Sequence, residues 1–367
     1  MALAAIALVA AVLVAEIVAT VHYHWRDRDD YTYHFGVPWW SFRSNRCFQN
    51  NEITAGKLFY TDHSGYRVPG PERSGAITYS MCIVGASNMS GLRLCYADSI
   101  SGRLEQALGS PILNLSAIGY DSDQGLWQLR RALDSGDYPA LRVALISFGI
   151  NDVGHWADNP ALGGTALFIH RLRLLSYVAT ELVVKPTRRQ LRQHCATYLP
   201  RVPLHRFKQN LIEMERLCAA RGITPIFLMD PLVYYPVLDS AAIQDILRNY
   251  YILRPDILRT DSTAERDIRL LLNAQDFGLE TLHPIIDPEK LEWKHYEAVM
   301  RLKPLFFDTN AVVQRAIREL HVSDQELFQP GYQTLGRVYP DHCHLNALGW
   351  RIVARELATF LRANGAV

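Results

Sequence analysis

The sequence predicts an α/β protein built around a parallel sheet. Two observations lead to this class: short apolar runs that end at glycine or other turn residues, and segments with helical spacing that separate these runs along the chain. Strands that alternate with helices form βαβ units, and βαβ units give parallel sheets. With 49% hydrophobic and 20% charged residues, the 367-residue chain has ordinary globular composition. The formal charge is only +1, which gives no support to a nucleic-acid binder with a broad basic face.

The chain begins with an apolar segment. Residues 2–15 carry no polar side chain, Glu16 interrupts the run, and residues 17–21 resume it. About 20 apolar helical residues cross a bilayer, whereas about 7–15 suffice for a signal peptide. Signal-peptide cleavage needs two small residues separated by one position, but Ile17 stands two residues before Ala19. We therefore expect residues 1–24 to form an uncleaved anchor. A removed signal peptide and a buried Ala-rich helix are the alternatives. Arg26 and Arg28 follow the segment, which by the positive-inside rule favours a cytoplasmic body.

The rest of the chain divides by pattern into a leading part and a main domain. Residues 25–76 are aromatic, polar and irregular, and we expect a stalk and a lead-in segment that lies over the main domain. The main domain is expected to span residues 77–363. Two stretches break its alternation of strands and helices and are interpreted as insertions, at 153–205 and 231–305.

Within the main domain the expected strands are short apolar runs that end in turns. They lie at residues 77–85, 111–115, 141–148 and 223–229. The expected helices repeat apolar residues at helical spacing. They lie at residues 92–108, 124–133, 206–220, 309–320 and 346–361.

The six cysteines show no CxxC motif and no Cys/His spacing typical of a metal site. We therefore expect most of them to be small buried hydrophobic residues. His22, His24 and His34 lie in an aromatic segment, where structural roles are more common than metal binding. The sequence predicts no metal ion and no cofactor.

Four separate segments carry groups that acyl transfer needs: a nucleophile, a base, a group that orients the base, and oxyanion donors. In the first, Ser87 follows a predicted strand and precedes a helix. The N-terminus of a helix favours negative charge at this position. Ser87 could instead merely cap the helix, and Ser90 is a rival nucleophile.

The second and third segments follow the next two strands. Gly119 lacks a Cβ atom, so its N–H could approach a substrate oxygen closely. Asn151 lies in the sequence Gly149-Ile150-Asn151-Asp152, directly after the clearest strand, and its side-chain amide can donate to an oxyanion. Ordinary turns are the alternative for both segments, because glycine and asparagine favour turns.

The fourth segment is Asp341-His342-Cys343-His344, just before the final helix. Side chains three residues apart in a helical turn lie on one face, so Asp341 could orient the ring of His344. His342 competes for the role of base. Two histidines beside an aspartate could alternatively bind a metal ion.

In this order, the four segments resemble the blocks of the SGNH (GDSL-like) hydrolase superfamily. Those blocks are a GDS-xxx-G nucleophile motif, a glycine after the second strand, GxND, and a C-terminal DxxH. One departure is Ala86, which stands where the family usually has an aspartate that is neither nucleophile nor base. Gly65-Tyr66-Arg67 and the apolar N-terminus also resemble the membrane-anchored bacterial branch.

The resemblance implies a flavodoxin-like three-layer sandwich and a serine ester hydrolase without a cofactor. It assigns Ser87 as nucleophile, His344 as base and Asp341 as its partner. The N–H groups of Ser87 and Gly119 and the side chain of Asn151 would form the oxyanion hole. The implied substrates are acyl esters, such as O-acetyl groups, of a cell-surface glycan or a lipid. That chemistry would place an anchored catalytic domain outside the cytoplasm.

Two other functions use the same sequence features. An acyltransferase would pass the acyl group from Ser87 to an alcohol instead of water. A non-catalytic scaffold would keep the fold and bind a glycan. Two Asn-x-Ser sequons, at Asn88 and Asn114, fall inside the expected site, where glycosylation would block chemistry. They disfavour passage through a eukaryotic secretory route.

Overall fold

The structure is a computed structural model of the 367-residue chain. It describes residues 11, 14–15, 31–33, 40–48, 56–71, 77–149, 151–152, 201–231, 305–334 and 337–367. The expected anchor lies almost entirely outside these residues, as do most of both expected insertions. Among the residues described, no helix is both long enough and apolar enough to cross a bilayer.

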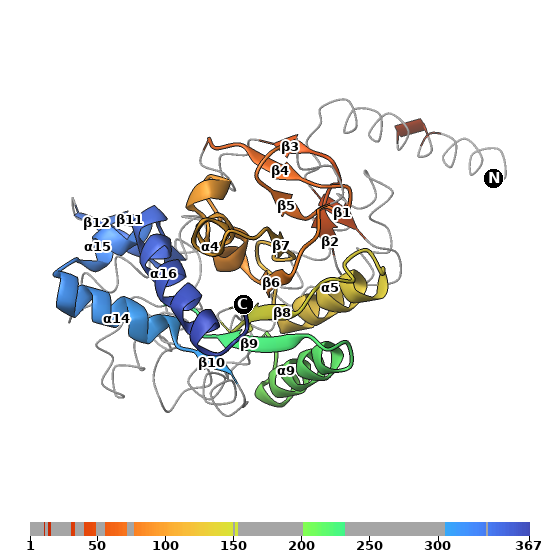
Figure 1. The fold of residues 1–367 in the computed structure, drawn as a ribbon. Coiled ribbons are helices and arrows are strands. Elements are labelled where there is room, and N and C mark those ends of the chain that lie inside the picture. Colours follow the sequence, from red (N-terminus) through yellow and green to blue (C-terminus); the bar gives the residue numbers. More distant parts are fainter. Residues whose placement is uncertain are drawn as a thin grey trace.

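An eight-stranded sheet forms the centre of the protein, in the order β10-β9-β8-β6-β7-β5-β4-β3 (Figure 1). Five of these strands run parallel. They are β6 (Met81–Gly85), β7 (Ile112–Asn114), β8 (Val143–Ser147), β9 (Thr224–Leu228) and β10 (Phe306–Phe307). All four strands expected from the sequence are present, and the prediction of an α/β protein with a mostly parallel sheet is confirmed. Strand order reverses at β6, which pairs with β7 on one side and β8 on the other.

The sheet continues beyond β7 as an antiparallel extension. Its strands are β5 (Arg67–Val68), β4 (Phe59–Thr61) and β3 (Cys47–Phe48). The extension joins the parallel part where Arg67 pairs with Asn114. This part of the chain, which we expected to be irregular, thus adds strands to the sheet. Two hairpins lie outside it: β1 (Tyr31–Tyr33) with β2 (Trp40–Phe42), and β11 (Phe328–Thr334) with β12 (Arg337–Leu345).

Helices follow most strands, as the alternating pattern predicts. They are α3 (Ser87–Ser90), α4 (Ile100–Leu108), α5 (Ser122–Asp134), α9 (Leu204–Ala219), α14 (Thr309–Leu320), α15 (Asp324–Leu327), α16 (Ala347–Ala363) and the 3-10 helix η2 (Tyr96–Asp98). Helix α4 begins eight residues later than expected because Ser99 caps it, accepting a hydrogen bond from the N–H of Gly102. Helix α5 begins with a capping box between Asp121 and Gln124.

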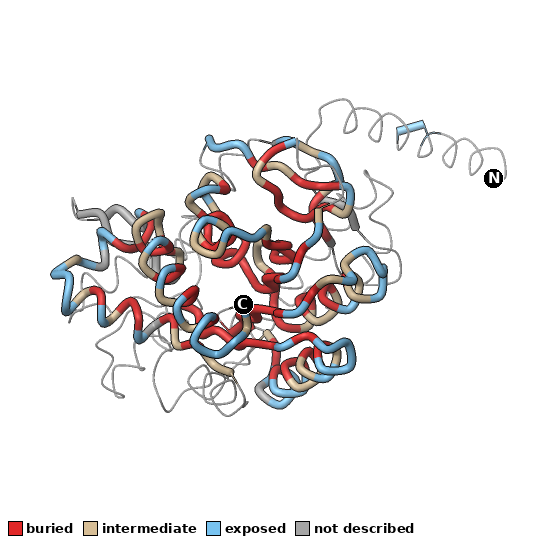
Figure 2. Tube along the Cα trace, viewed as in Figure 1, coloured by how far each residue is buried: buried red, intermediate tan, exposed pale blue. Residues whose placement is uncertain are grey.

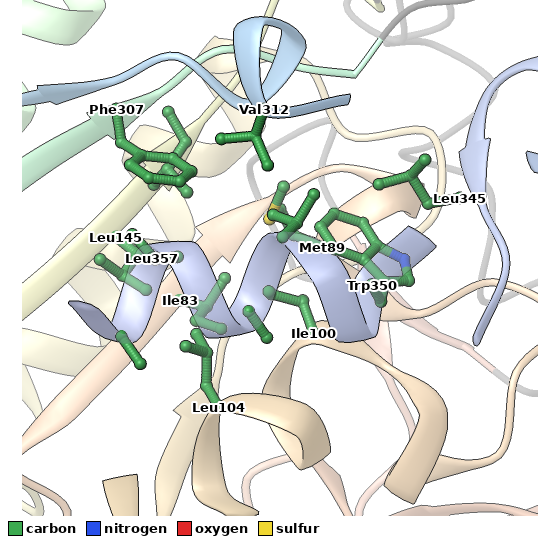
Figure 3. Packing of buried hydrophobic residues seen from close by; sticks show 14 of the residues in the cluster. Ile83, Met89, Ile100, Leu104, Leu145, Phe307, Val312, Leu345, Trp350 and Leu357 are labelled. Atoms are coloured by element: carbon green, nitrogen blue, oxygen red, sulfur yellow. The ribbon is translucent and has the colours of Figure 1, made fainter. Parts of the chain in front are cut away.

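The helices cover both faces of the sheet, which explains why most positions of the parallel strands are apolar and buried. From β6, Ile83 packs into a cluster with α4, α14 and α16, whereas Cys82 and Val84 pack with α5 and α9. Figure 2 shows the buried strands between exposed outer helix surfaces. Figure 3 shows the first cluster, in which Met89, Leu345 and Trp350 lie together. Burial of each such side chain stabilises the fold by about 1.5–3 kcal/mol.

The buried cysteines among the described residues behave as the composition suggested. Cys82 and Cys218 are buried free thiols, and burial raises the pKa of both well above the ordinary value for cysteine. Cys95 is partly buried and Cys47 is exposed.

Candidate active site

Ser87 lies at the carboxyl end of β6, at the point where strand order reverses. In open parallel sheets, ligands bind at this position. Ala86 is the N-cap of α3 and makes no side-chain cap bond, so Ser87 is the first helical residue and not the cap. Its Oγ lies 2.7 Å from Nε2 of His344, 257 residues further along the chain. This contact is a hydrogen bond between a hydroxyl and an imidazole, and the Ser87 side chain is available for it because it caps nothing.

The rival hydroxyl of Ser90 points into the protein. Ser90 is fully buried, and its Oγ donates to the carbonyl oxygen of Ser87 at 3.0 Å. Helix α3 has a single turn and ends at Gly91, which adopts φ +76°. The Ser90 hydroxyl therefore stabilises this short turn and does not face His344.

Arg67 holds the carboxyl end of α3. Its guanidinium donates to the carbonyl oxygens of Ser90, Gly91 and Leu94. The side chain is fully buried and lies over the ring of Phe59, 4.5 Å from the centroid. Burial lowers the pKa of Arg67 to about 10. The antiparallel extension of the sheet thus places a buried cation directly behind α3, the turn that begins with Ser87.

His344 lies near the end of β12, in an irregular part of the β11–β12 hairpin. Phe328 pairs with Leu345, and Pro330 pairs with Pro340, so β12 carries three more residues than β11 between these two pairs. Asp341 to His344 therefore lie in a bulge. Bulges redirect side chains and often occur beside active sites. The expected helical turn at Asp341–His344 is wrong, and the face-sharing reason for pairing these two residues does not apply.

The side chains of Asp341 and His342 lie outside the described part of the chain, so the role of Asp341 stays a prediction. His344 itself is partly buried.

A buried amide ties the His344 segment to the Ser87 segment. The side-chain nitrogen of Gln329 donates to the carbonyl oxygen of Leu92 at 2.8 Å and to that of Leu345 at 3.1 Å. Leu92 follows the nucleophile turn, and Leu345 follows His344. Both N–H groups of the amide are thus used to hold the segments of Ser87 and His344 at a fixed separation.

Gly119 lies in a tight turn after β7, beside the end of β6. The N–H of Ala117 donates to the carbonyl oxygen of Gly85, and the N–H of Tyr120 donates to that of Ala117 at 3.3 Å. Gly119 is third in this turn, with φ +75°. A Cβ atom added here would meet nothing within 4 Å among the described residues. The positive φ therefore favours glycine here, and the expected close approach of a substrate oxygen to its N–H stays a prediction.

Asn151 follows β8, which pairs with β6 on the side away from β7. Its side-chain nitrogen donates to the carbonyl oxygen of Tyr120 at 2.9 Å. A primary amide has two N–H groups. The bond to Tyr120 therefore orients the amide and leaves the other N–H to face a further acceptor. The segments of Ser87, Gly119 and Asn151 meet at one edge of the sheet.

Asp152 and Asp121 are fully buried behind this edge. Oδ1 of Asp152 accepts hydrogen bonds from the N–H and hydroxyl of Ser122, at 2.9 Å for the N–H. Asp121 accepts from the N–H of Gln124 as the cap of α5. Burial raises the pKa of both carboxyl groups, and the charge of Asp121 raises the pKa of Asp152 further. Asp152 thus links the Asn151 loop to the start of α5.

Sequence reasoning assigned no role to three residues that hold this site: Arg67, Arg201 and Gln329. Each donates to backbone carbonyl groups far away in the chain, a contact that leaves no spacing pattern. The capping-box pattern of Asp121 and Gln124 is visible in the sequence and could have predicted where α5 starts, at the same edge of the sheet. Within the described ranges, no group of three His, Cys, Asp or Glu side chains lies close enough to hold a metal ion.

No family model matches the sequence, and a search of curated proteins found no match. Solved structures to which the chain is similar include protein YXIM from Bacillus subtilis, at 14% identity and a TM-score of 0.39. That similarity covers 80% of this chain but 58% of the Bacillus protein, so this chain spans little more than half of its length.

Two further similar structures are a lipolytic protein of the G-D-S-L family from Veillonella parvula and an acetyl-xylooligosaccharide esterase from Geobacillus. The first has 11% identity and a TM-score of 0.35, covering 77% of this chain and 97% of that one. The second has 14% identity and a TM-score of 0.34, covering 78% and 95%. The G-D-S-L family is the one whose motifs this sequence resembles. We base the functional interpretation on the side-chain geometry of this chain and not on these distant overall similarities.

Proposed function

We propose that the protein is a serine ester hydrolase in which Ser87 is the nucleophile and His344 is the general base. The observation that carries this proposal is the 2.7 Å contact between Ser87 Oγ and His344 Nε2. A nucleophile within hydrogen-bond reach of a base is the first requirement of covalent catalysis by serine. The location of the pair, at the carboxyl edge of a mostly parallel sheet, supports the same function.

The proposed reaction follows from these positions. Ser87 Oγ attacks the carbonyl carbon of an ester while Nε2 of His344 takes its proton. The N–H groups of Ser87 and Gly119 and the amide of Asn151 stabilise the oxyanion. The imidazolium then protonates the leaving alcohol, and an acyl-Ser87 ester remains. Water, deprotonated by His344, attacks this ester and releases the acid and free Ser87.

For Nε2 to accept the proton, the hydrogen of neutral His344 must lie on Nδ1. A carboxylate that accepts from Nδ1 fixes this tautomer and stabilises the imidazolium. We propose Asp341 for this role. Asp341 lies three residues before His344 in the same bulge, and this proximity supports the assignment.

The finer features carried by the family resemblance belong to the same proposal. They are an O-acetyl or similar acyl ester of a cell-surface glycan or lipid as substrate, and an N-terminal anchor that holds the catalytic domain outside the cytoplasm. The three-layer arrangement is supported by apolar clusters on both faces of the sheet. An acyltransferase would share every step up to acyl-Ser87. Product analysis with a glycan acceptor separates the two, because only the transferase makes a new ester.

The test compares three serine variants with p-nitrophenyl acetate and a fluorophosphonate probe. Ser87→Ala is expected to abolish both turnover and labelling. Ser90→Ala tests the rival hydroxyl and should keep most activity, since Ser90 Oγ only supports the turn. Ser135→Ala is the matched remote control, because Ser135 makes a similar bond to the carbonyl oxygen of Ala132. Wild-type turnover by folded Ser87→Ala would refute the proposal.

Asn151→Ala tests the oxyanion hole separately. Loss of one oxyanion donor typically lowers kcat by about 10²–10³. The variant should still react with the probe, more slowly than the wild type, because Ser87 and His344 remain. A kcat equal to that of the wild type would remove Asn151 from the mechanism.

A further inference from the structure

Arg201 reaches the back of the Gly119 turn from a distant part of the chain. Its Nη2 donates to the carbonyl oxygen of Gly119 at 3.0 Å and to Oε1 of Gln124 at 2.9 Å. Its Nε lies 2.8 Å from Oδ2 of Asp121, with which it forms an ion pair. The guanidinium therefore contacts the turn and the capping box of α5 at once, and only 12% of the Arg201 side chain is exposed.

The Gly119 turn needs such support. Glycine populates positive and negative φ about equally, so its own conformational preference does not fix where the Gly119 N–H points. Two successive carbonyl groups of the turn are held from outside: that of Gly119 by Arg201, and that of Tyr120 by Asn151. Together these bonds restrain the peptide groups on the carboxyl side of the proposed oxyanion donor.

Arg201 is itself held close to the Asn151 loop. The N–H of its neighbour Val202 donates to the carbonyl oxygen of Asp152 at 2.8 Å. The backbone at Arg201 is therefore fixed against the loop that carries Asn151, while its side chain reaches the turn that carries Gly119. One residue thereby connects the two segments that supply oxyanion donors.

We propose that Arg201 is a positioning residue that holds the Gly119 and Asn151 segments in the geometry of an oxyanion hole. This inference rests on the proposed ester hydrolase function. Arg201 acts through Gly119 and does not touch the reacting atoms. Its role requires a planar fork that reaches three acceptors in different directions, which the single ammonium of lysine cannot do.

Arg201 forms an ion pair with Asp121, so its charge is compensated there. The hydrogen bond to the carbonyl oxygen of Gly119 is a separate interaction. Asp121 supplies the counter-charge, and the buried carboxyl of Asp152 lies in the same network. Arg201 lowers the pKa of both carboxyl groups against the effect of burial. Asp121 thus pairs with the same guanidinium whose Nη2 donates to the turn.

The test uses the full chain, p-nitrophenyl acetate and four variants. Arg201→Gln and Arg201→Lys are expected to lower kcat by about 10- to 100-fold with KM changed by less than about threefold, because a small displacement of a donor slows chemistry more than binding. Lysine should not rescue. Arg206→Gln is the matched control: Arg206 also pairs with an aspartate at the start of α5, but its side chain is 55% exposed and it bonds no oxyanion segment.

The fourth variant, Asp121→Asn, separates positioning from helix capping. Asparagine keeps the cap acceptor for Gln124 but removes the charge that Arg201 faces. The variant is expected to lower kcat less than Arg201→Gln does, since it removes the ion pair but leaves the donor for the carbonyl oxygen of Gly119. Should Arg201→Gln fail to fold, Arg201→Lys gives the same readout, because it preserves the charge opposite Asp121.

Three results would overturn the inference. They are a wild-type kcat in a folded Arg201 variant, rescue by lysine, and an equal kcat loss in Asp121→Asn and Arg201→Gln, which would mean that the ion pair with Asp121, and not the bond to Gly119, carries the effect. Failure of the proposed function looks different. In that case the wild-type protein itself neither turns over the ester nor labels with a fluorophosphonate at Ser87, and the role of Arg201 falls with it.

Discussion

Arg67 offers the sharpest test of how the nucleophile turn is held, through the change Arg67→Met. Methionine fills much of the same volume and keeps apolar contact with Phe59, but it has no donor for the carbonyl groups of Ser90, Gly91 and Leu94. The change therefore removes the hydrogen bonds while leaving the packing largely intact.

The structure sets the expected magnitude. Each buried carbonyl left without a donor costs about 1–3 kcal/mol, so those of Ser90 and Leu94 together cost about 4 kcal/mol. The carbonyl of Gly91 still accepts from the N–H of Leu94, so the lost bond from Arg67 adds only about 1 kcal/mol. Removing the cation also removes its desolvation penalty. Burial lowers the pKa of Arg67 from its ordinary value to about 10, and at 1.36 kcal/mol per unit this penalty is about 3 kcal/mol. The net expectation is a loss of about 2 kcal/mol in the free energy of unfolding.

Urea unfolding measures this loss against the matched control Arg142→Met. Arg142 also donates to two carbonyl oxygens, those of Pro139 and Leu141, but it is exposed. Its replacement should change stability by no more than about 0.5 kcal/mol. If Arg67→Met unfolds within about 1 kcal/mol of the wild type, the three bonds do not stabilise the turn as argued. Esterase kcat should fall in the same variant, because the first residue of the turn is Ser87.

Three further predictions follow from the geometry. Gly119→Ala should lower stability by about 1–2 kcal/mol through its positive φ and lower kcat more than it raises KM, because the strained backbone displaces the proposed oxyanion donor; a wild-type kcat would contradict this. Asp152→Asn should remove a pH dependence. Because the native pKa is raised, the native state holds this proton when the unfolded chain has lost it, so the contribution of Asp152 to stability falls as pH rises above about 4. Stability of the asparagine variant relative to the wild type should thus increase with pH, by up to about 1.4 kcal/mol per unit, and a constant difference in urea unfolding would refute the raised pKa. Gln329→Met should cost about 2–6 kcal/mol by leaving the carbonyl groups of Leu92 and Leu345 without donors, and should lower kcat more than it raises KM; unchanged kinetics would show that the two segments need no tie.

The sheet was largely predictable because its strands are buried on both faces. Such strands read as unbroken apolar runs, and the run at residues 141–148 contains the observed β8, Val143–Ser147. Helix starts were less predictable. Apolar residues between 92 and 98 have helical spacing, yet they form a turn and η2 because Ser99 caps the helix that follows. The capping signal in the sequence decided the boundary, and the periodicity alone did not.

The placement of Ser87, Gly119 and Asn151 followed from one rule: parallel strands end at the same edge of a sheet. The arrangement around His344 could not follow from any local rule. The bulge in β12 exists only because of its register with β11, and register is set by pairing between segments that the sequence does not mark. The prediction of a helical turn for residues 341–344 is therefore wrong, because these residues lie in a bulge of β12. His344 nevertheless contacts Ser87.

The elements that carry the site are too small to hold their own shape. A helix of one turn, such as α3, is not stable by itself, a glycine turn has no side chain to anchor it, and a bulge lacks regular ladder bonds. Each is instead held by a long side chain that donates to its backbone carbonyl groups or those beside it: Arg67 at α3, Arg201 at the Gly119 turn, and Gln329 between the Leu92 and Leu345 segments. These donors fix the site from behind, since they bond to carbonyl oxygens and leave the N–H groups and side chains on the opposite side to face a substrate. Substitutions that slow the reaction without touching substrate should therefore cluster at these three residues.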